Sequence, residues 1–220
     1  MKYQDRVEAG QQLAARLIAY ANRPDVLVLG LARGGMPVAF EVAEALGVPL
    51  DVFVVRKLGV PGHEELAMGA IASGGVRILN EEVVRWLDVL PEFIHTVAAR
   101  EQRILEYREH FYRHDRPAPE VQGRTVILVD DGLATGATMR AAVTAMRQRQ
   151  PARIVVAVPV AASSTCAELR AVADEVVCVA TPEPFHAVGL WYEDFSPTGD
   201  AEVRDLLIQA SQRQAVSAYR

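Results

Sequence analysis

The 220-residue sequence predicts an α/β protein built on a doubly wound, mostly parallel sheet. Short apolar runs rich in β-branched residues alternate with segments of helical periodicity, and such alternation requires crossover connections between parallel strands. The run over residues 126–129 is continuously apolar, as expected for a strand buried on both faces. Ligands of such sheets bind beyond the carboxyl ends of the strands. The turns after residues 29, 55 and 129 are therefore the candidate ligand-binding turns.

The first half of the chain is predicted to hold two strands separated by a helix, followed by a loop and a hairpin. Its expected elements are a helix with an apolar stripe at Leu13, Leu17 and Ile18, a strand over residues 26–29, a helix over 36–46, a strand over 50–55, a polar loop over 58–65 and a hairpin around 73–75. Gly30 stops the first strand and Gly47 closes the helix, because glycine interrupts both kinds of element. Two glycines and a proline mark the polar loop.

An inserted helical segment is predicted over residues 81–122. Asn80 is a suitable N-cap, and the two glutamates that follow it are favourably placed in the first helical turn. A long helix is expected over residues 91–114, because its apolar residues keep to one stripe while arginines occupy the other face. A linker with two prolines then ends the segment. We interpret the chain as a single domain that carries this insertion.

The second half repeats the alternation of strands and helices. Its expected elements are a strand over residues 126–129, a helix over 136–149, a strand over 154–160, a helix opened by Thr165, a strand over 176–179, a loop over 181–198 and a final helix from about residue 201. Thr165 and Glu168 have the spacing of a capping box, in which two side chains satisfy backbone N–H groups reciprocally. The loop over 181–198 is rich in proline and aromatic residues.

Composition and charge exclude several classes of partner. The formal net charge is −5, so the surface has no general attraction for nucleic acid or anionic membranes. The N-terminal residues lack the apolar run of a signal peptide and no stretch is long enough to span a bilayer, which predicts a cytoplasmic protein. Cys166 and Cys178 form no CxxC pair and lie in apolar patterns. We expect two buried, reduced thiols rather than a disulfide.

The strongest functional signal follows the strand over residues 126–129. That strand places Asp130 and Asp131 at the carboxyl edge of the sheet, and Gly132 permits a sharp turn. The next helix opens with small residues only: Ala134, Thr135, Gly136, Ala137 and Thr138. Small residues let a phosphate approach the backbone N–H groups of a helix N-terminus. Paired carboxylates suit the hydroxyl donors of a neighbouring diol.

Two other interpretations fit parts of this segment. An Asp-Gly turn followed by a capped helix would need no ligand. Receiver domains of response regulators also carry an acidic pair after a strand, but there the pair lies near the domain's start and a phosphoacceptor aspartate ends a later strand. Asp174 is the only candidate at a suitable distance, and it precedes a strand, which argues against a receiver domain.

The run over residues 126–138, four aliphatic residues followed by DDGLATGAT, closely resembles the signature of type I phosphoribosyltransferases. The resemblance implies that family's fold and the binding of 5-phosphoribosyl 1-pyrophosphate. Asp130 and Asp131 would hold the ribose hydroxyls, directly or through Mg²⁺, and residues 134–138 would hold the 5′-phosphate.

The turn after the first strand is similar to the pyrophosphate loop of the same family. It consists of Ala32, Arg33, Gly34 and Gly35. A glycine-rich turn alone more often only marks the boundary between a strand and a helix. Beside the phosphoribosyl signature, however, it implies that Arg33 faces the departing pyrophosphate, because a guanidinium fork matches phosphate oxygens.

The polar loop over residues 58–65 resembles the family's mobile lid. Arg56, Lys57 and His63 bracket this loop, and by the resemblance they would neutralise pyrophosphate, while Glu64 or Glu65 would touch the acceptor. The alternative is a solvated loop with charged residues at a strand end.

Residues 181–198 resemble the hood with which the family recognises the base. Phe185, Trp191 and Tyr192 would stack on a planar acceptor, or would instead pack the hood onto the sheet, which is the more usual role of aromatic residues. Within one residue of alignment, Glu193 corresponds to a magnesium-contacting acid of hypoxanthine-guanine enzymes.

The resemblance implies a Mg²⁺-dependent phosphoribosyltransferase, a pentosyltransferase among the glycosyltransferases, that acts in nucleotide metabolism as a homodimer. It would transfer the phosphoribosyl group to a nitrogen acceptor, most simply a nucleobase. Hypoxanthine and guanine fit poorly, because Ala134 stands where 6-oxopurine enzymes have an aspartate and residues 156–160 contain no lysine. The sequence does not identify the acceptor.

Two alternatives remain beside the enzyme. A regulatory protein would keep the phosphoribosyl site without catalysis; the acidic composition counts against it, and the arginine face of the long helix is in its favour. A nucleoside or sugar-phosphate hydrolase on a similar sheet has no supporting motif.

Overall fold

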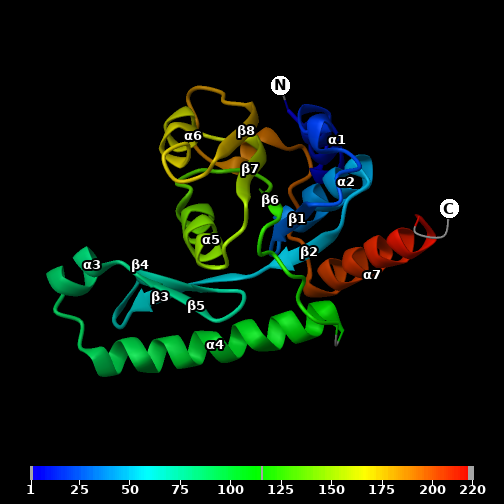
Figure 1. The fold of residues 1–220 in the computed structure, drawn as a ribbon. Coiled ribbons are helices and arrows are strands. Elements are labelled where there is room, and N and C mark those ends of the chain that lie inside the picture. Colours follow the sequence, from blue (N-terminus) through cyan, green and yellow to red (C-terminus); the bar gives the residue numbers. More distant parts are fainter. Residues whose placement is uncertain (1, 115, 218–220) are drawn as a thin grey trace.

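The computed structural model describes residues 2–114 and 116–217, and its centre is a parallel sheet with helices on both faces (Figure 1). Five strands lie in the order β2-β1-β6-β7-β8, with every neighbouring pair parallel. Their bounds are β1 (Val26–Leu31), β2 (Leu50–Phe53), β6 (Thr125–Val129), β7 (Arg153–Val160) and β8 (Glu175–Ala180). The predicted doubly wound parallel sheet is confirmed.

Alternate residues of each central strand point to opposite faces, and both faces are covered. One face packs against α1 (Arg6–Arg16), α2 (Gly35–Leu46) and α7 (Asp200–Ser217), and the other against α5 (Ala137–Gln148) and α6 (Ser163–Leu169). Val28 and Ile127 point to the first face, and Leu29 and Leu128 to the second. Ile18 is not part of the stripe predicted for the first helix, because it lies in the 3-10 helix η1 (Ile18–Tyr20) and is 64% exposed.

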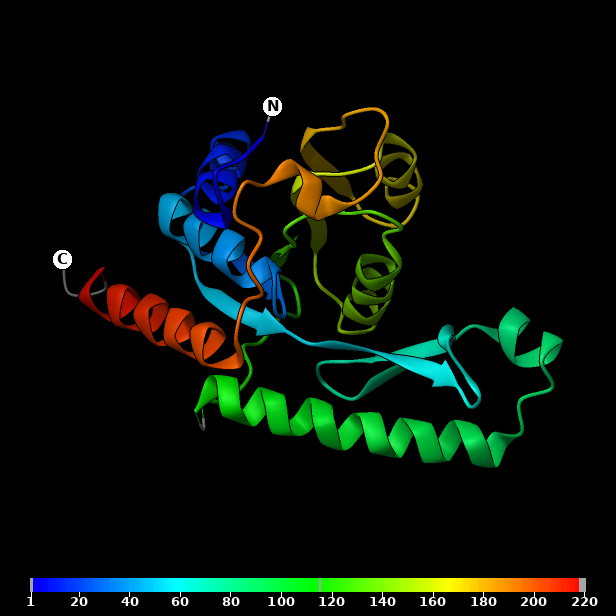
Figure 2. The same cartoon turned by 180° about the vertical axis from the view of Figure 1, so that it is seen from behind.

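A second, antiparallel sheet and two helices form an extension to one side of the central sheet, over residues 55–113 (Figure 2). Its elements are β3 (Val55–Val60), β4 (His63–Ala72), β5 (Val76–Leu79), α3 (Glu81–Trp86) and α4 (Pro91–Arg113). The predicted long helix is α4, and the predicted hairpin joins β4 to β5. The excursion from the central sheet therefore begins at Val55, and the predicted insertion over residues 81–122 contains only its helical part.

The prediction of a polar loop over residues 58–65 is wrong. Val60 pairs with His63, and a tight turn through Gly62, whose φ is +79°, joins β3 to β4. Leu58 and Val60 are buried while their neighbours are less so. That alternation makes the segment a strand in spite of its glycines and polar residues.

Ion pairs fix α4 to both sheets. The carboxylate of Glu101, a residue only 4% exposed, accepts a hydrogen bond of 2.8 Å from Nε of Arg56 in β3. At the end of α4, Arg113 is bonded to Asp51 at 3.1 Å, to Glu109 at 2.9 Å and to the Val52 carbonyl oxygen at 3.0 Å. Removal of one partner from a buried pair leaves an uncompensated charge. These contacts therefore hold the extension in place.

The helix termini differ in how well their capping signals predict them. Asn80 is the N-cap of α3, as predicted, and its side chain accepts a hydrogen bond from the Val83 N–H. The capping box predicted at Thr165 is wrong, because α6 begins at Ser163 and Thr165 lies inside it. The Thr165 hydroxyl instead donates to the Ala134 carbonyl oxygen at 2.6 Å. Over the part of the chain that the structure describes, no helix combines the length and the apolar character needed to cross a bilayer.

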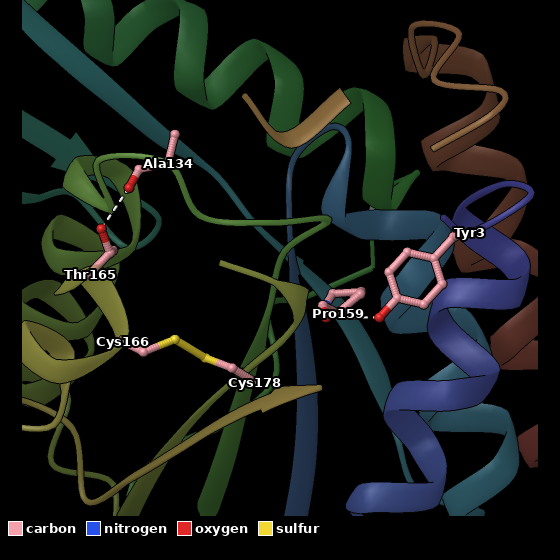
Figure 3. The surroundings of a disulfide bond; sticks show 6 residues. All are labelled: Tyr3, Ala134, Pro159, Thr165, Cys166 and Cys178. Atoms are coloured by element: carbon pink, nitrogen blue, oxygen red, sulfur yellow. Dashed lines mark hydrogen bonds between the residues drawn. A yellow bond between two sulfur atoms is a disulfide. The ribbon is translucent and has the colours of Figure 1, made fainter. Parts of the chain in front are cut away.

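The prediction of two reduced thiols is also wrong, because Cys166 and Cys178 form a disulfide (Figure 3). Cys166 lies in α6 and Cys178 in β8. The crossover from α6 returns the chain to the sheet, and Cys178 points to the face that α6 covers, together with Val176. The spacing of the two residues in sequence does not reveal this return.

Reduction of the disulfide is expected to destabilise the protein by about 3 kcal/mol, because the open thiols release a short closed loop of the unfolded chain. For a chain of this size the loss corresponds to a fall in Tm of about 6–12 °C. Thermal unfolding with and without a dithiol reductant measures it. The double variant Cys166→Ala/Cys178→Ala is the control, since its Tm should not respond to the reductant. An unchanged Tm of the native protein would contradict the bond's contribution.

Candidate functional site

Asp130 and Asp131 follow β6 at the carboxyl edge of the central sheet. Asp131 is buried, and its Oδ2 accepts a hydrogen bond from Arg6 Nε at 2.9 Å. Asp130 is partly buried, and its Oδ1 accepts one from the Asp131 N–H at 2.9 Å. Each carboxylate thus keeps an oxygen that these hydrogen bonds do not engage.

Burial and mutual repulsion make the acid pair electrostatically costly. Desolvation raises the pKa of Asp130 well above its ordinary value, and the neighbouring Asp131 carboxylate raises it further. Desolvation also raises the pKa of Asp131, while the charge and hydrogen bond of Arg6 oppose that rise. Unfavourable charge arrangements of this kind concentrate at functional sites. A ligand with hydroxyl donors, or a cation, would relieve the repulsion.

The turn between β1 and α2 packs directly against the acid pair. A Cβ on Gly35 would lie 2.6 Å from the Val129 carbonyl oxygen and 2.8 Å from Asp130 Cα. A Cβ on Gly34 would collide with Oδ2 of Asp131. The two turns can approach this closely only because neither residue has a side chain. The structure therefore brings together the residues predicted for pyrophosphate and those predicted for ribose.

Ala32 and Arg33, which precede these glycines, are joined by a cis peptide. The Arg33 side chain is 42% exposed, and its Nη1 lies 4.0 Å from Oδ1 of Asp200, at the start of α7. Asp200 also accepts a hydrogen bond of 2.5 Å from the Tyr112 hydroxyl. Such an exposed ion pair is weak. The guanidinium is therefore free to turn toward a phosphate.

One side of the turn over residues 134–138 packs against Thr165, and its other side is exposed to solvent. Gly136 is buried with φ +67°, and a Cβ there would lie 2.6 Å from Thr165 Cγ2. Thr165 also binds the Ala134 carbonyl oxygen, as Figure 3 shows. Ala134, Thr135 and Ala137 are exposed and Thr138 is half-buried. The N-terminus of α5 thus presents backbone N–H groups that the helix itself cannot satisfy, which is the arrangement that binds phosphate.

A cavity of about 410 Å³ lies between α5 and the extension. Its lining includes Lys57 of β3 together with Ala137 and Thr138. Lys57 is exposed, so its ammonium can reach a ligand at the start of α5. His63 is exposed and does not line the cavity, and Arg56 is paired with Glu101. The side chains of Glu64 and Glu65, predicted to touch the acceptor, lie outside the described residues.

The hood packs onto the acid pair through Tyr192. Its hydroxyl donates to the Asp131 carbonyl oxygen at 2.5 Å, its ring lies 5.5 Å from that of Tyr3, and the residue is 2% exposed. Burial raises the pKa of the Tyr192 hydroxyl, and the Asp131 charge adds to the effect. Tyr192 thus supports the backbone of the acid pair. Stacking of its ring on a base stays a prediction.

Trp191 and Phe185 form the more accessible part of the hood. Trp191 ends the 3-10 helix η2 (Val188–Trp191), and its ring stacks on that of Phe185 with centroids 6.3 Å apart. Both residues are partly exposed, and the buried indole Nε1–H has no hydrogen-bond partner among the side chains and backbone that the structure describes. Their role in base binding stays a prediction. Glu193 is exposed and its N–H donates to the Tyr3 carbonyl oxygen at 2.8 Å, and its role toward a metal likewise stays a prediction.

Sequence reasoning missed Arg6 and Tyr3. Arg6 stands at the start of α1 and touches Asp131 across 125 positions of sequence. Tyr3 forms an isolated parallel bridge with Tyr192, and its hydroxyl donates to the Pro159 carbonyl oxygen at 2.9 Å. Neither residue belongs to a motif. Only the packing of the N-terminal segment beneath the hood reveals their part in the site.

The acid pair has the chemistry to hold Mg²⁺ together with the oxygens of a phosphorylated ligand. Among the side chains that the structure describes, no three of His, Cys, Asp or Glu gather as a protein-only metal site requires. Mg²⁺ is commonly held by one or two carboxylates together with substrate oxygens and water. Asp130 and Asp131 provide that number of carboxylates at the place where the ligand's oxygens would lie.

Comparison with known proteins agrees with this geometry. A family model described as the phosphoribosyl transferase domain matches residues 2–192. Two provisionally named phosphoribosyl transferases from strains of Mycobacterium tuberculosis are 46% identical over 208 residues, which are 94% of this chain and 47% of each relative. The chain therefore spans about half the length of the curated relatives it matches.

Solved structures share the fold. TT1426 from Thermus thermophilus is 43% identical, with a TM-score of 0.83 over 95% of this chain and 99% of that one. AQ2163 protein from Aquifex aeolicus is 12% identical, with a TM-score of 0.52 over 92% of this chain and 84% of that one, and shows likeness of fold alone. The likeness to TT1426 thus extends over nearly the whole of both chains.

Proposed function

The chain belongs to the phosphoribosyl transferase family, and we propose that it transfers the phosphoribosyl group of 5-phosphoribosyl 1-pyrophosphate to a nitrogen acceptor, with release of pyrophosphate. The acceptor class that we favour is a nucleobase. Dependence on Mg²⁺, assembly as a homodimer and a cytoplasmic location belong to the same proposal. The contact between the glycine turn after β1 and the acid pair after β6 is the observation that carries it.

In the proposed mechanism each turn holds one part of the donor. Asp130 and Asp131 accept hydrogen bonds from the ribose hydroxyls, and charged acceptors bind such donors well. The N-terminus of α5 holds the 5′-phosphate through its N–H groups and dipole. Arg33 and Lys57 face the pyrophosphate, whose negative charge grows as it departs.

The reaction requires electrostatic and positional help rather than a covalent nucleophile. The acceptor nitrogen attacks C1′ as the bond to pyrophosphate breaks, and positive charge builds on the ribose ring. Rigid attachment of ribose and phosphate to adjacent turns fixes C1′ in line with the acceptor, which lowers the entropic part of the barrier. Mg²⁺ would supply charge neutralisation of the leaving group. The acid pair stabilises the developing positive charge.

Pyrophosphate release across a panel of nucleobases, with 5-phosphoribosyl 1-pyrophosphate and Mg²⁺, tests the proposal. We expect release with at least one base, and a loss of at least about a hundredfold in Asp131→Asn, by analogy with removal of a single preorganised electrostatic contact. Asp205→Asn, in an exposed ion pair with Arg204 on α7, makes the same chemical change at the surface and should keep the native rate. No turnover with any base, together with tight binding of a ribonucleotide, would contradict catalysis and favour a regulatory protein on the same fold.

A further inference from the structure

Arg6 joins three parts of the molecule that meet at the acid pair. Its Nε donates to Oδ2 of Asp131 at 2.9 Å, and its Nη1 donates to the Ser196 carbonyl oxygen at 2.8 Å. The guanidinium carbon lies 4.0 Å from the ring centroid of Phe195, a cation–π distance. Arg6 therefore links α1 to the acid pair and to the hood, and its planar guanidinium contacts both of these at once.

The ion pair is sheltered from solvent, which increases its strength. The side chains of Arg6 and Asp131 are 11% and 13% exposed. Screening by water and salt is weaker at such a site than on the open surface. The other titratable groups that face Asp131 are Asp130, which is adjacent in sequence, and Tyr192, whose hydroxyl binds the Asp131 carbonyl oxygen. Arg6 is the positive charge that opposes the desolvation of Asp131.

The contacts also limit where the Asp131 carboxylate can point. Arg6 lies on one side of it, the Gly34 turn on another, and Tyr192 fixes the peptide that carries it. The Asp130 carboxylate faces the Gly35 turn and accepts from the Asp131 N–H, but no ion pair with it is found among the described residues, and the residue is partly exposed. The two acids therefore differ, with Asp131 held rigidly and Asp130 more accessible.

We propose that Arg6 is a positioning residue, which holds the Asp131 carboxylate in its orientation toward the ribose and couples that orientation to the order of the hood. The inference rests on the proposed function, because the benefit of an oriented carboxylate is the binding of the donor's hydroxyls. It predicts that a substitution at Arg6 alters the order of both the hood and the acid pair, because Arg6 contacts the hood through Ser196 and Phe195.

The test compares the native protein with Arg6→Gln, Arg6→Lys and Arg16→Gln. Arg16 is exposed on the same helix, so its variant removes one positive charge without touching the acid pair. We expect NMR of the ligand-free Arg6→Gln protein to show the signals of the Asp131 carboxyl group and of the Phe195 ring changed together, because Arg6 contacts both. Calorimetry should show binding of 5-phosphoribosyl 1-pyrophosphate weakened about tenfold to a hundredfold, the range for loss of a charge-assisted hydrogen bond.

The rescue variant separates positioning from a purely structural role. Arg6→Lys keeps the charge and should recover most of the native donor affinity, while Arg16→Gln should match the native protein throughout. Native signals of the Asp131 carboxyl group and of the Phe195 ring in Arg6→Gln would overturn the inference whether or not the chain binds the donor. Native donor binding in a well-folded Arg6→Gln protein would overturn it too. Failure of the native protein to bind donor, with these signal changes present in Arg6→Gln, would instead overturn the proposed function.

Discussion

Gly35→Ala is expected to abolish donor binding and to destabilise the fold. The new Cβ would lie 2.6 Å from the Val129 carbonyl oxygen and 2.8 Å from Asp130 Cα, both backbone atoms of the central strand end. Backbone cannot turn aside as a flexible side chain can, so the turn after β1 must move away from the acid pair. Overpacking of this kind costs about 1–3 kcal/mol. Displacement of the turn after β1 should reduce the free energy of donor binding by more than this amount, because the proposal has this turn and the acid pair hold the same ligand.

Gly199→Ala is the matched control, because nothing lies within 4 Å of the Cβ it would introduce. Chemical denaturation should place the control within about 0.5 kcal/mol of the native protein, as for ordinary surface substitutions. Calorimetric titration with the donor should show native affinity for the control and none for Gly35→Ala. Native affinity in Gly35→Ala would show that the two turns do not act on one ligand.

Asp130→Asn is expected to make the protein more stable and unable to bind the donor. The substitution removes a desolvated charge beside a second carboxylate, while it keeps the size of the side chain. The gain in the free energy of unfolding at neutral pH should be about 1 kcal/mol, the usual size for a stabilising substitution. The loss of a charged acceptor for the ribose hydroxyls should remove binding. Opposite signs for stability and binding are typical of a functional residue.

The pH dependence of this gain has a defined sign. The pKa of Asp130 is raised in the folded protein, so its protonated form favours folding and this contribution is lost as pH rises through the folded pKa. The advantage of Asp130→Asn should therefore be absent below about pH 4, where the aspartate is protonated in both states, and should grow as pH increases.

Asp205→Asn again serves as the surface control, because it removes a charge from the exposed pair with Arg204 and should change neither property. Thermal unfolding between about pH 3 and pH 8 in parallel with calorimetry measures both effects, over the range in which carboxylates titrate. An Asp130→Asn protein less stable than the native one at neutral pH would contradict the account of the acid pair.

The central sheet and its candidate ligand-binding turns could be predicted because their signals are local. A strand buried on both faces must be continuously apolar, and the small residues at the start of α5 are adjacent in sequence. The acid pair and the glycine turn after β1 could be placed together as well, since carboxyl ends of parallel strands meet at one edge. Each of these inferences requires only the periodicity of the chain and the topology that it implies.

The features that were missed depend on contacts between distant segments. Arg6 reaches Asp131 only because α1 packs beneath the hood, and Cys166 meets Cys178 only after the crossover returns to β8. Thr165 has the spacing of a cap but forms its hydrogen bond with Ala134 on another turn. Propensity and spacing carry no information on such partners. Residues 58–60, which end β3, were predicted as a loop for a different reason. The glycine and the polar residues nearby indicate a loop, and this signal was given more weight than the apolar residues at alternate positions.

Calorimetric titration with ribose 5-phosphate and with 2-deoxyribose 5-phosphate, beside 5-phosphoribosyl 1-pyrophosphate and with or without Mg²⁺, tests most directly whether the acid pair and the start of α5 hold one sugar phosphate. We predict saturable, Mg²⁺-dependent binding of the donor, competition by ribose 5-phosphate, and binding at least about tenfold weaker for the deoxy sugar, which lacks one hydroxyl for the carboxylates. Absence of Mg²⁺-dependent heat with the donor, or equal affinity for the two pentose phosphates, would contradict it.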